Sequence, residues 1–338
     1  MPVECRAETV LVIKLGALGD VVLALPHIAR IQASHPGHCL TVLTAPEYAP
    51  LFTALPGIEV VAFPRKGFIA MARLLRWLFG QRVEVVYDLQ GSLRSRIMTL
   101  LTQAPVRVGG NTDFAYTHAP VAADATRRHA CDRLNRLLAA AGIEPAVPDW
   151  RMPVLPAAQS RVNAWLHGHG LAEQSLVLLH AGSSPRWPSK RWPAAYFREL
   201  SQSLAGHGLH AIWIGGADDA GLNGTLARAT GTDASGEFSY PELAALARHA
   251  VFALTNDSGP MHILAAAGLP VYAFFGPTDW RRSHAPGQQQ RVLTNPVVCS
   301  PCLLPVCPPP QHHECLRGIS PAMVIARLEA DGLVPGGE

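Results

Sequence analysis

The sequence predicts an α/β protein built from two doubly wound parallel-sheet domains. Short runs rich in Val, Ile and Leu alternate with helical patterns of ten or more residues along both halves of the chain, which is typical of βαβ units. A chain of 338 residues is also too long for one ordinary core and suits two domains of ~150 residues each. Near-continuous apolar strands favour sheets that are covered on both faces.

The first half contains four strand patterns, each followed by a helical pattern. The strands are expected at 9–15, 38–45, 59–63 and 83–89. The helices are expected at 20–36, 46–55, 68–80 and 92–103. The segment 144–156 then has four prolines in thirteen residues, which indicates an extended connection between domains. We therefore expect the first domain at 1–156.

Alternation of the same kind restarts beyond the connection. The strands of the second half are expected at 175–182, 210–216, 251–257 and 270–276. Its helices are expected at 193–208, 218–230, 241–250 and 259–268. A last helical pattern begins with a Ser cap and a Pro in its first turn. The second domain is thus expected at 157–320, with a closing helix and tail at 321–338.

Composition excludes several classes of protein. The net charge of +3 is too small to favour nucleic-acid binding. No stretch of eighteen or more apolar residues is present, so no transmembrane segment is predicted. The first apolar run carries Lys14 and Asp20 and does not resemble a signal peptide. We expect a cytoplasmic protein, where structural disulfides are rare.

The loops that follow the strands carry the candidate chemistry, because ligands of doubly wound domains bind beyond the carboxyl ends of the strands. The first loop reads KLGALGDVV. Gly16 and Gly19 allow a tight turn and a close approach of the backbone to a ligand. Asp20 follows them, either as a general base for an incoming hydroxyl or as a cap of its own helix.

Two further loops combine glycine with polar side chains. In HAGSSPRWPSKRWP, Ser183 and Ser184 are able to donate to phosphate oxygens, and Lys190 to place a positive charge on a diphosphate. In GGADDAG, Asp218 is the candidate for binding ribose hydroxyls, and Asp219 could instead cap the next helix. A purely structural role, as an exposed polar loop, is the alternative for each.

The fourth loop, TNDSGPMHILAAAG, runs from a strand into a helix of small residues. Ser258 and Gly259 open this helix, whose free N–H groups favour an anion. Asp257 would have to hold the loop or touch sugar hydroxyls, because a carboxylate repels phosphate. His262 lies on the first turn, where a histidine is more often structural.

These four motifs, in this order and each after a strand, resemble glycosyltransferase family 9, the ADP-heptose lipopolysaccharide heptosyltransferases. The resemblance covers about residues 9 to 325. It implies a GT-B architecture, in which two Rossmann-like domains face a central cleft, with the acceptor bound by the first domain and the donor by the second. It also implies an inverting transfer of heptose from ADP-heptose, without a metal or other cofactor at the reaction centre.

The resemblance implies roles for individual residues. Asp20 is similar to the family's catalytic base, and Asp257 to the acid that touches the heptose. Asp218 falls where an acidic residue, usually the longer Glu, holds the adenosine ribose. The residues implied on the diphosphate side are Ser183, Ser184, Lys190, Ser258, Gly259 and His262.

The acceptor implied by the resemblance is an anionic inner-core glycolipid at the inner membrane surface, so the cytoplasmic enzyme is expected to work peripherally there. Cations in the first domain suit such a ligand. The candidates for acceptor binding are Gly19, Arg65, Lys66, Arg94 and Arg96. Rival hypotheses are a protein acceptor, a nucleotide-sugar epimerase on the same scaffold and a non-catalytic binding module. An NAD dehydrogenase is disfavoured because neither half carries G-x-G-x-x-G.

Four of the seven cysteines lie in CSPCLLPVCPPPQHHEC, away from these motifs. Cys299, Cys302, Cys307 and Cys315 have thiols soft enough for structural zinc or iron, and His312 or His313 could replace one of them. The spacing is not that of a zinc ribbon. Thiols that merely pack and disulfides are the alternatives. In each case this loop is interpreted as a structural staple rather than the reaction centre.

Overall fold

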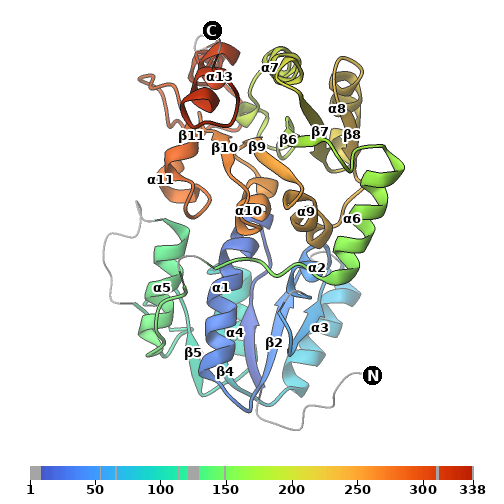
Figure 1. Ribbon diagram of the computed structural model, residues 1–338. Coiled ribbons are helices and arrows are strands. Elements are labelled where there is room, and N and C mark those ends of the chain that lie inside the picture. Colours follow the sequence, from blue (N-terminus) through green and yellow to red (C-terminus); the bar gives the residue numbers. More distant parts are fainter. Residues whose placement is uncertain are drawn as a thin grey trace. The chain divides into compact units, whose positions relative to one another are not determined.

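The computed structural model describes residues 9–53, 55–64, 67–112, 114–120, 129–147, 150–309 and 312–336. The chain divides into two compact units, Met1–Trp150 and Arg151–Glu338, each a parallel sheet with helices packed against it (Figure 1). The boundary expected at 156 lies a few residues beyond this division. The two-domain α/β fold class is confirmed.

The sheet of the first unit has five strands in the order β3-β2-β1-β4-β5, and all its pairs are parallel. Its strands are β1 (Thr9–Ile13), β2 (Cys39–Thr44), β3 (Ile58–Ala62), β4 (Val83–Asp88) and β5 (Val106–Val108). Strands β1 and β2 are buried along almost their whole length, as strands covered on both faces must be.

The helices of this unit are α1 (Leu18–Ser34), α2 (Ala49–Phe52) after the 3₁₀ turn η1 (Pro46–Tyr48), α3 (Phe68–Gly80), α4 (Leu93–Leu101) and α5 (Ala130–Ala140). Helices α1 to α4 connect consecutive strands of this unit, and α5 follows its last strand. Helix α1 contacts α5, and α3 contacts α4. Helices α3 and α4 bury Leu74, Leu78 and Met98 in one apolar cluster with Leu11 and Val86 of the sheet.

The sheet of the second unit has six parallel strands in the order β11-β10-β9-β6-β7-β8. Its strands are β6 (Ser175–His180), β7 (Leu209–Gly215), β8 (Thr232–Ser235), β9 (Ala250–Asn256), β10 (Val271–Phe274) and β11 (Val292–Leu293). Its α-helices are α6 (Pro156–Gly168), α7 (Ala194–Gly206), α8 (Ala220–Ala227), α9 (Tyr240–Ala247), α10 (Gly259–Ala266), α11 (Trp280–Ser283), α12 (Glu314–Arg317) and α13 (Pro321–Ala330). Its 3₁₀ turns are η2 (Pro188–Lys190), η3 (Ala217–Asp219) and η4 (Gln289–Arg291).

Aromatic side chains fill the core of the second unit. Trp192 is buried and stacks on Phe274, with ring centroids 4.3 Å apart, while Phe197 meets both rings edge-on. Val324 and Leu328 of α13 belong to the same core cluster. The closing helix is therefore an integral part of the second unit.

Each sheet has one point where the strand order reverses, and this point determines where a ligand can bind. In the first unit the chain moves outward in both directions from neighbouring strands β1 and β4, and in the second from β6 and β9. The loops that leave two such strands diverge to opposite faces and open a crevice beyond their carboxyl ends. Three of the four predicted loops follow these strands.

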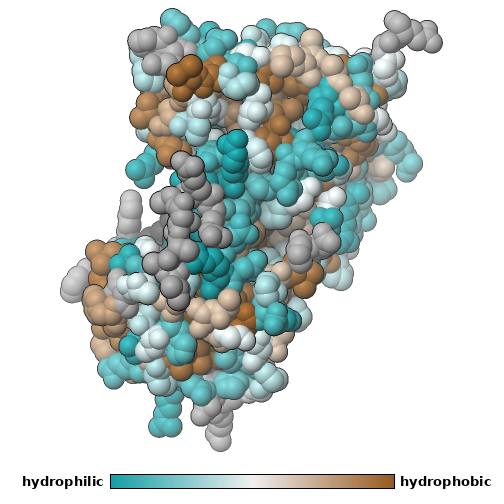
Figure 2. Space-filling view, turned by 90° about the vertical axis from the view of Figure 1, so that its left-hand side faces the viewer, coloured by the Kyte–Doolittle hydropathy of each residue, from teal (hydrophilic) through white to brown (hydrophobic). Residues whose placement is uncertain are grey.

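The surface contrasts with these apolar cores. The face shown in Figure 2 is mainly hydrophilic, with apolar side chains gathered in small groups. Among the helices in the described ranges, none has the length and apolarity needed to cross a bilayer.

Candidate active site

A cavity of about 520 Å³ lies at the reversal point of the first sheet. Its polar and charged lining residues include Lys14, Asp20, Asp88, Gln90, Arg96, Asn111, Arg133 and Arg136. They come from the end of β4, from the loops after β1, β4 and β5, and from helices α1, α4 and α5. The first unit therefore concentrates two carboxylates and several cations in one cavity.

Asp20 lies in the first turn of α1 and is exposed. The residue at the helix N-cap is Ala17, and no side chain caps this end. A helix-capping role for Asp20 is therefore not seen. The partial positive charge of the helix N-terminus favours a carboxylate at this position, and Asp20 presents its side chain to the cavity. Gly19 precedes it in the same turn and is only partly exposed.

Asp88 and Gln90 fix the two loops that border the cavity. The buried Asp88 accepts hydrogen bonds at Oδ1 from the backbone N–H groups of Gln90 and Gly91, both at 2.9 Å, and at Oδ2 from the Tyr116 hydroxyl at 2.7 Å. Gln90 Oε1 in turn accepts from the backbone N–H groups of Leu15 at 2.9 Å and Gly16 at 3.1 Å. The loop that leads into Asp20 is thus tied to the end of β4.

Lys14 is a buried cation at the same edge of the sheet. Its Nζ donates to the carbonyl of Leu89 at 3.2 Å. Burial lowers the pKa of Lys14 below its ordinary value, and the carboxylates of Asp20 and Asp88 oppose that shift. Sequence reasoning did not select Lys14 as a residue of the site. Its position directly after a buried strand was the signal that could have identified it.

Among the predicted acceptor-binding cations in the described residues, one lines the cavity and one does not. Arg96 lines the cavity. Arg94 is exposed and is not part of its lining, while Arg65 and Lys66 lie outside the described residues. Sequence reasoning missed Arg133 and Arg136, which lie one helical turn apart on α5 and line the cavity.

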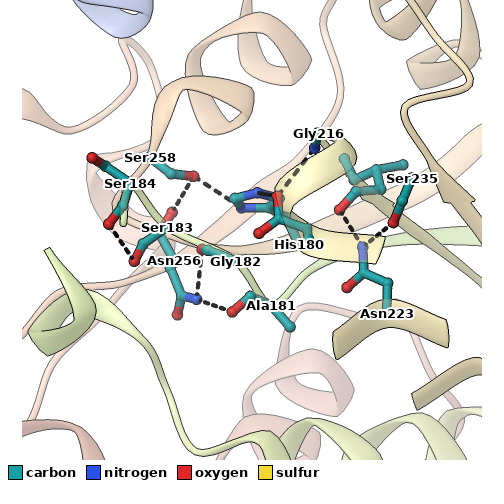
Figure 3. Close-up of polar contacts among 12 residues, drawn as sticks. His180, Ala181, Gly182, Ser183, Ser184, Gly216, Asn223, Ser235, Asn256 and Ser258 are labelled. Atoms are coloured by element: carbon teal, nitrogen blue, oxygen red, sulfur yellow. Dashed lines mark hydrogen bonds and ion pairs between the residues drawn. The ribbon is translucent and has the colours of Figure 1, made fainter. Parts of the chain in front are cut away.

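In the second unit, His180 at the end of β6 contacts the loops that follow β9 and β7 (Figure 3). Its Nδ1 is 3.0 Å from Ser258 Oγ, at the N-terminus of α10, and its Nε2 is 3.7 Å from Asp219 Oδ2. Burial alone would raise the pKa of Asp219, but the contact with His180 and its charge, the Gly216 N–H and the charge of Arg191 lower it below its ordinary value. Asp219 is therefore held ionised beside a buried imidazole.

Asp219, rather than Asp218, is the carboxylate turned into this cluster. Asp219 Oδ2 accepts from the Gly216 N–H at 3.0 Å, whereas Asp218 is exposed. A Cβ added at Gly182 would lie 2.1 Å from Asp219 Oδ1, and one at Gly215 2.6 Å from Oδ2. Glycine is required at both positions because the carboxylate packs directly against their backbone.

Asn256 anchors the loop after β6. It is fully buried, and its Nδ2 donates to the carbonyls of Ala181 at 2.9 Å and Gly182 at 3.0 Å (Figure 3). Its Oδ1 accepts from the Trp192 N–H at 2.9 Å. One side chain at the end of β9 thus fixes both the start and the end of the loop that contains the predicted donor-binding residues.

Lys190 and Asp257 form a close ion pair, with 2.7 Å between Nζ and Oδ2. Asp257 Oδ2 also accepts from the Thr278 hydroxyl at 2.6 Å, and Lys190 Nζ lies 5.3 Å from the centre of the Trp187 ring. The structure therefore brings together two predicted site residues that are 67 positions apart in the sequence.

The other predicted residues of this unit lie in the same loops. Ser183 is buried, donates to the Trp187 carbonyl at 2.9 Å and accepts from Arg191 Nε at 3.1 Å, whereas Ser184 is exposed. Gly259 opens α10, and His262 is buried on that helix. Of the two serines, Ser184 is the more accessible to a ligand.

The four cysteines of the proline-rich loop surround one small cavity of about 50 Å³. All four are free thiols, so disulfides are not formed between them. Burial and the neighbouring thiols raise the pKa of Cys315 to about 11. Among the described residues, no three metal-ligating side chains are grouped closely enough to hold an ion. The Nε2 of His313 instead forms a hydrogen bond with the Ser189 carbonyl.

Comparison with known proteins agrees with this architecture. The family described as glycosyltransferase family 9 (heptosyltransferase) matches residues 71–313. The chain is 28% identical over 364 residues to lipopolysaccharide heptosyltransferase 1 of Pseudomonas aeruginosa, covering 96% of this chain and 98% of that one.

Solved structures show the same fold. A glycosyltransferase family 9 protein from Veillonella parvula has a TM-score of 0.81 at 21% identity and covers 97% of this chain and 98% of its own. Escherichia coli heptosyltransferase WaaC with ADP has a TM-score of 0.73 at 20% identity and covers 96% and 99%. The predicted GT-B architecture of two Rossmann-like domains is thereby confirmed. Since the family match spans well over half of the sequence, this chain belongs to glycosyltransferase family 9 and is a glycosyltransferase.

Proposed function

We propose that this enzyme transfers heptose from ADP-heptose to an inner-core lipopolysaccharide acceptor, with inversion at the anomeric carbon. The observation that carries the proposal is the position of Asp20, an exposed carboxylate with no capping role in a cation-rich cavity at a sheet's reversal point. The similarity to lipopolysaccharide heptosyltransferase 1 supports the substrate class.

The donor is assigned to the second unit. The diphosphate is bound by Lys190, Ser184 and the N–H groups that open α10 after Ser258. Charge-assisted bonds from Lys190 and the helix N-terminus attract a diphosphate. Its phosphate oxygens compete with Asp257 for the Lys190 ammonium, which releases the Asp257 carboxylate to accept from heptose hydroxyls.

The remaining predicted donor residues have supporting roles. Ser183 holds the loop through Trp187 and Arg191, and His262 lies behind Gly259 on α10. Asp218 is exposed beyond β7, where it is able to accept from ribose hydroxyls, while Asp219 orders the backbone beside it.

The chemistry is a single displacement. The acceptor hydroxyl attacks the anomeric carbon as the bond to the ADP oxygen breaks, and Asp20 accepts the hydroxyl proton. Negative charge develops on the departing diphosphate, where Lys190 and the α10 N-terminus stabilise it. The residues described provide for this step without a catalytic cofactor.

The acceptor is assigned to the cavity of the first unit. Arg96, Arg133 and Arg136 present guanidinium groups that bind carboxylates and phosphates in a bidentate manner. Arg94, two residues before Arg96 on α4, remains a candidate, and Arg65 and Lys66 remain candidates outside the described residues. An anionic glycolipid fits these groups, and its lipid anchor places the proposed reaction at a membrane surface, which for a cytoplasmic enzyme is the inner face of the inner membrane.

A structural metal is proposed for the second unit. Four soft thiols around one cavity suit zinc or iron, but Cys299, Cys302, Cys307 and Cys315 would have to draw closer together to bind it. Metal analysis of protein purified without chelator should find about one equivalent, and a Cys302→Ser variant should lose it with a lower melting temperature. Less than ~0.2 equivalents in the unmodified protein would reject the site.

The proposed function is tested by incubating purified enzyme with ADP-heptose and a panel of acceptors. We expect ADP release and a mass gain of one heptosyl unit on a deacylated inner-core oligosaccharide, with no reaction with UDP- or GDP-sugars. Transfer to a protein alone would support the protein-acceptor alternative. Conversion of the donor without any acceptor would support an epimerase, and donor binding without turnover a binding module.

A further inference from the structure

Two adjacent helices of the first unit expose large apolar side chains. Helices α3 and α4 contact each other and bury Leu74, Leu78 and Met98 against the sheet. The opposite, outward side of the pair is not polar, as solvent-facing helices usually are. The exposed fractions of its apolar residues are 69% for Ile69, 57% for Phe79, 72% for Leu93 and 50% for Ile97.

The charges on the two helices all have one sign. Neither α3 nor α4 contains an Asp or Glu. Arg73 and Arg76 on α3 and Arg94 on α4 are exposed, and within the described residues none of the three forms an ion pair with a carboxylate. In a chain with 25 acidic residues, every charged side chain on these two helices is an arginine.

The apolar and basic groups are interleaved along each helix. Ile69, Arg73, Arg76 and Phe79 are spaced by four, three and three residues, so they form one stripe. Leu93 and Ile97 are one turn apart on α4, with Arg94 beside them. Apolar side chains among cations, with no acidic residue, are the pattern of a helix that lies in the interface of an anionic bilayer.

We propose that the outward face of α3 and α4 docks on an anionic lipid surface. The four apolar side chains enter the boundary between headgroups and acyl chains, while the three arginines bind lipid phosphates. Each cation near such a surface strengthens binding roughly fivefold. The inference rests on the proposed function in one respect, since a lipid-anchored acceptor has to be reached at that surface.

The position of Arg96 connects this face to the acceptor cavity. Arg96 belongs to α4 and lines the cavity, whereas Leu93 and Ile97 of the same helix are exposed. A glycolipid anchored in the bilayer under α4 therefore has its sugar end close to the cavity. An enzyme docked through this face finds its acceptor by diffusion along the membrane in two dimensions rather than through solution in three.

The test uses flotation of the full-length enzyme with vesicles. We expect binding to vesicles of phosphatidylethanolamine and phosphatidylglycerol, weaker binding at high salt, and little binding to phosphatidylcholine. Replacing Phe79 and Ile97 together by Ser should weaken binding at least ~10-fold, as should Arg73→Glu with Arg76→Glu. Met323→Ser, which alters an exposed apolar side chain on α13, is the matched control and should change nothing.

Activity assays separate this inference from the proposed function. With a deacylated acceptor, the Phe79→Ser and Ile97→Ser enzyme should turn over normally, and with vesicle-bound acceptor it should be slower by a similar factor to the loss of binding. Vesicle binding without any heptosyl transfer would reject the proposed function and leave the docking face standing. Equal binding to neutral vesicles, unchanged binding of the variants, or a wild-type dimer that these substitutions dissociate would overturn the docking proposal.

Discussion

The side-chain oxygen of Gln90 accepts a hydrogen bond from the backbone N–H of Gly16 at 3.1 Å, and a second from Leu15 at 2.9 Å. This relationship connects two loops that are 74 residues apart in the sequence. The loop that contains Gly16 leads directly into the first turn of α1, where Asp20 is located. Gln90 therefore positions the proposed base from a neighbouring strand.

Gln90→Met removes the acceptor oxygen at nearly constant size. We expect kcat to fall between ~10- and ~100-fold, because small displacements of a catalytic group are costly, while the KM for ADP-heptose stays constant. Gln90→Glu replaces the amide oxygen with a carboxylate oxygen that still accepts from both N–H groups, and it should recover most of kcat. Its added negative charge disfavours a second carboxylate nearby, so the acid limb of the kcat profile should move to higher pH. Equal losses in both variants would show a merely structural role.

Lys190→Met should weaken ADP binding. The substitution removes a charge-assisted contact worth about 1.5–3 kcal/mol, so titration calorimetry should find a Kd larger by roughly 10- to 100-fold. Arg198→Met, at an exposed cation on α7, is the control and should bind ADP as the wild type does. An unchanged Kd for Lys190→Met would remove Lys190 from the diphosphate site.

Asn256→Ala should destabilise the second unit. Three hydrogen bonds to buried backbone groups are lost, at about 1–3 kcal/mol for each group left unsatisfied. Urea unfolding should show a decrease of at least ~2 kcal/mol in the free energy of unfolding. Gln174→Ala, at an exposed amide on the surface, should stay within ~0.5 kcal/mol of the wild type. A similarly small change in Asn256→Ala would contradict an anchoring role.

Asp219 should make stability depend on acid pH. Burial alone would raise its pKa, but the contact with His180 and its charge, the Gly216 N–H and the charge of Arg191 together lower the pKa in the folded protein. The stabilisation is therefore complete above the ordinary Asp pKa of about 3.9 and is lost as pH falls through the lower folded value. Melting temperatures of wild type and Asp219→Asn should differ at pH 7 and converge towards pH 3. A difference that does not change with pH would contradict this ionisation.

Much of the fold followed from local patterns. Buried parallel strands are continuously apolar, so β1, β2, β4 and β6 were visible as short Val- and Leu-rich runs, and the helices between them followed from spacing. The short strand β5 was not predicted, because Val106–Val108 is too brief to form a pattern. Helix α5 was not predicted either. Loops after strands led to Asp20, Lys190 and Ser258.

The residues that sequence reasoning missed depend on tertiary structure. Arg133 and Arg136 enter the cavity because α5 packs on α1, a contact that no local pattern encodes. The choice between Asp218 and Asp219 depends on the turn η3, whose geometry directs the second carboxylate under Gly182 and Gly215. His180 ends a strand as an apparently ordinary core residue, and only the strand order places it between Ser258 and Asp219.

The central claim is that Asp20 is the base in heptosyl transfer. The most direct measurement compares Asp20→Asn with wild type in one experiment, with ADP affinity determined by calorimetry and product formation from ADP-heptose determined by mass spectrometry. We predict an unchanged Kd for ADP and a fall in kcat of ~10²- to 10⁴-fold. Near-normal turnover by Asp20→Asn would contradict the claim.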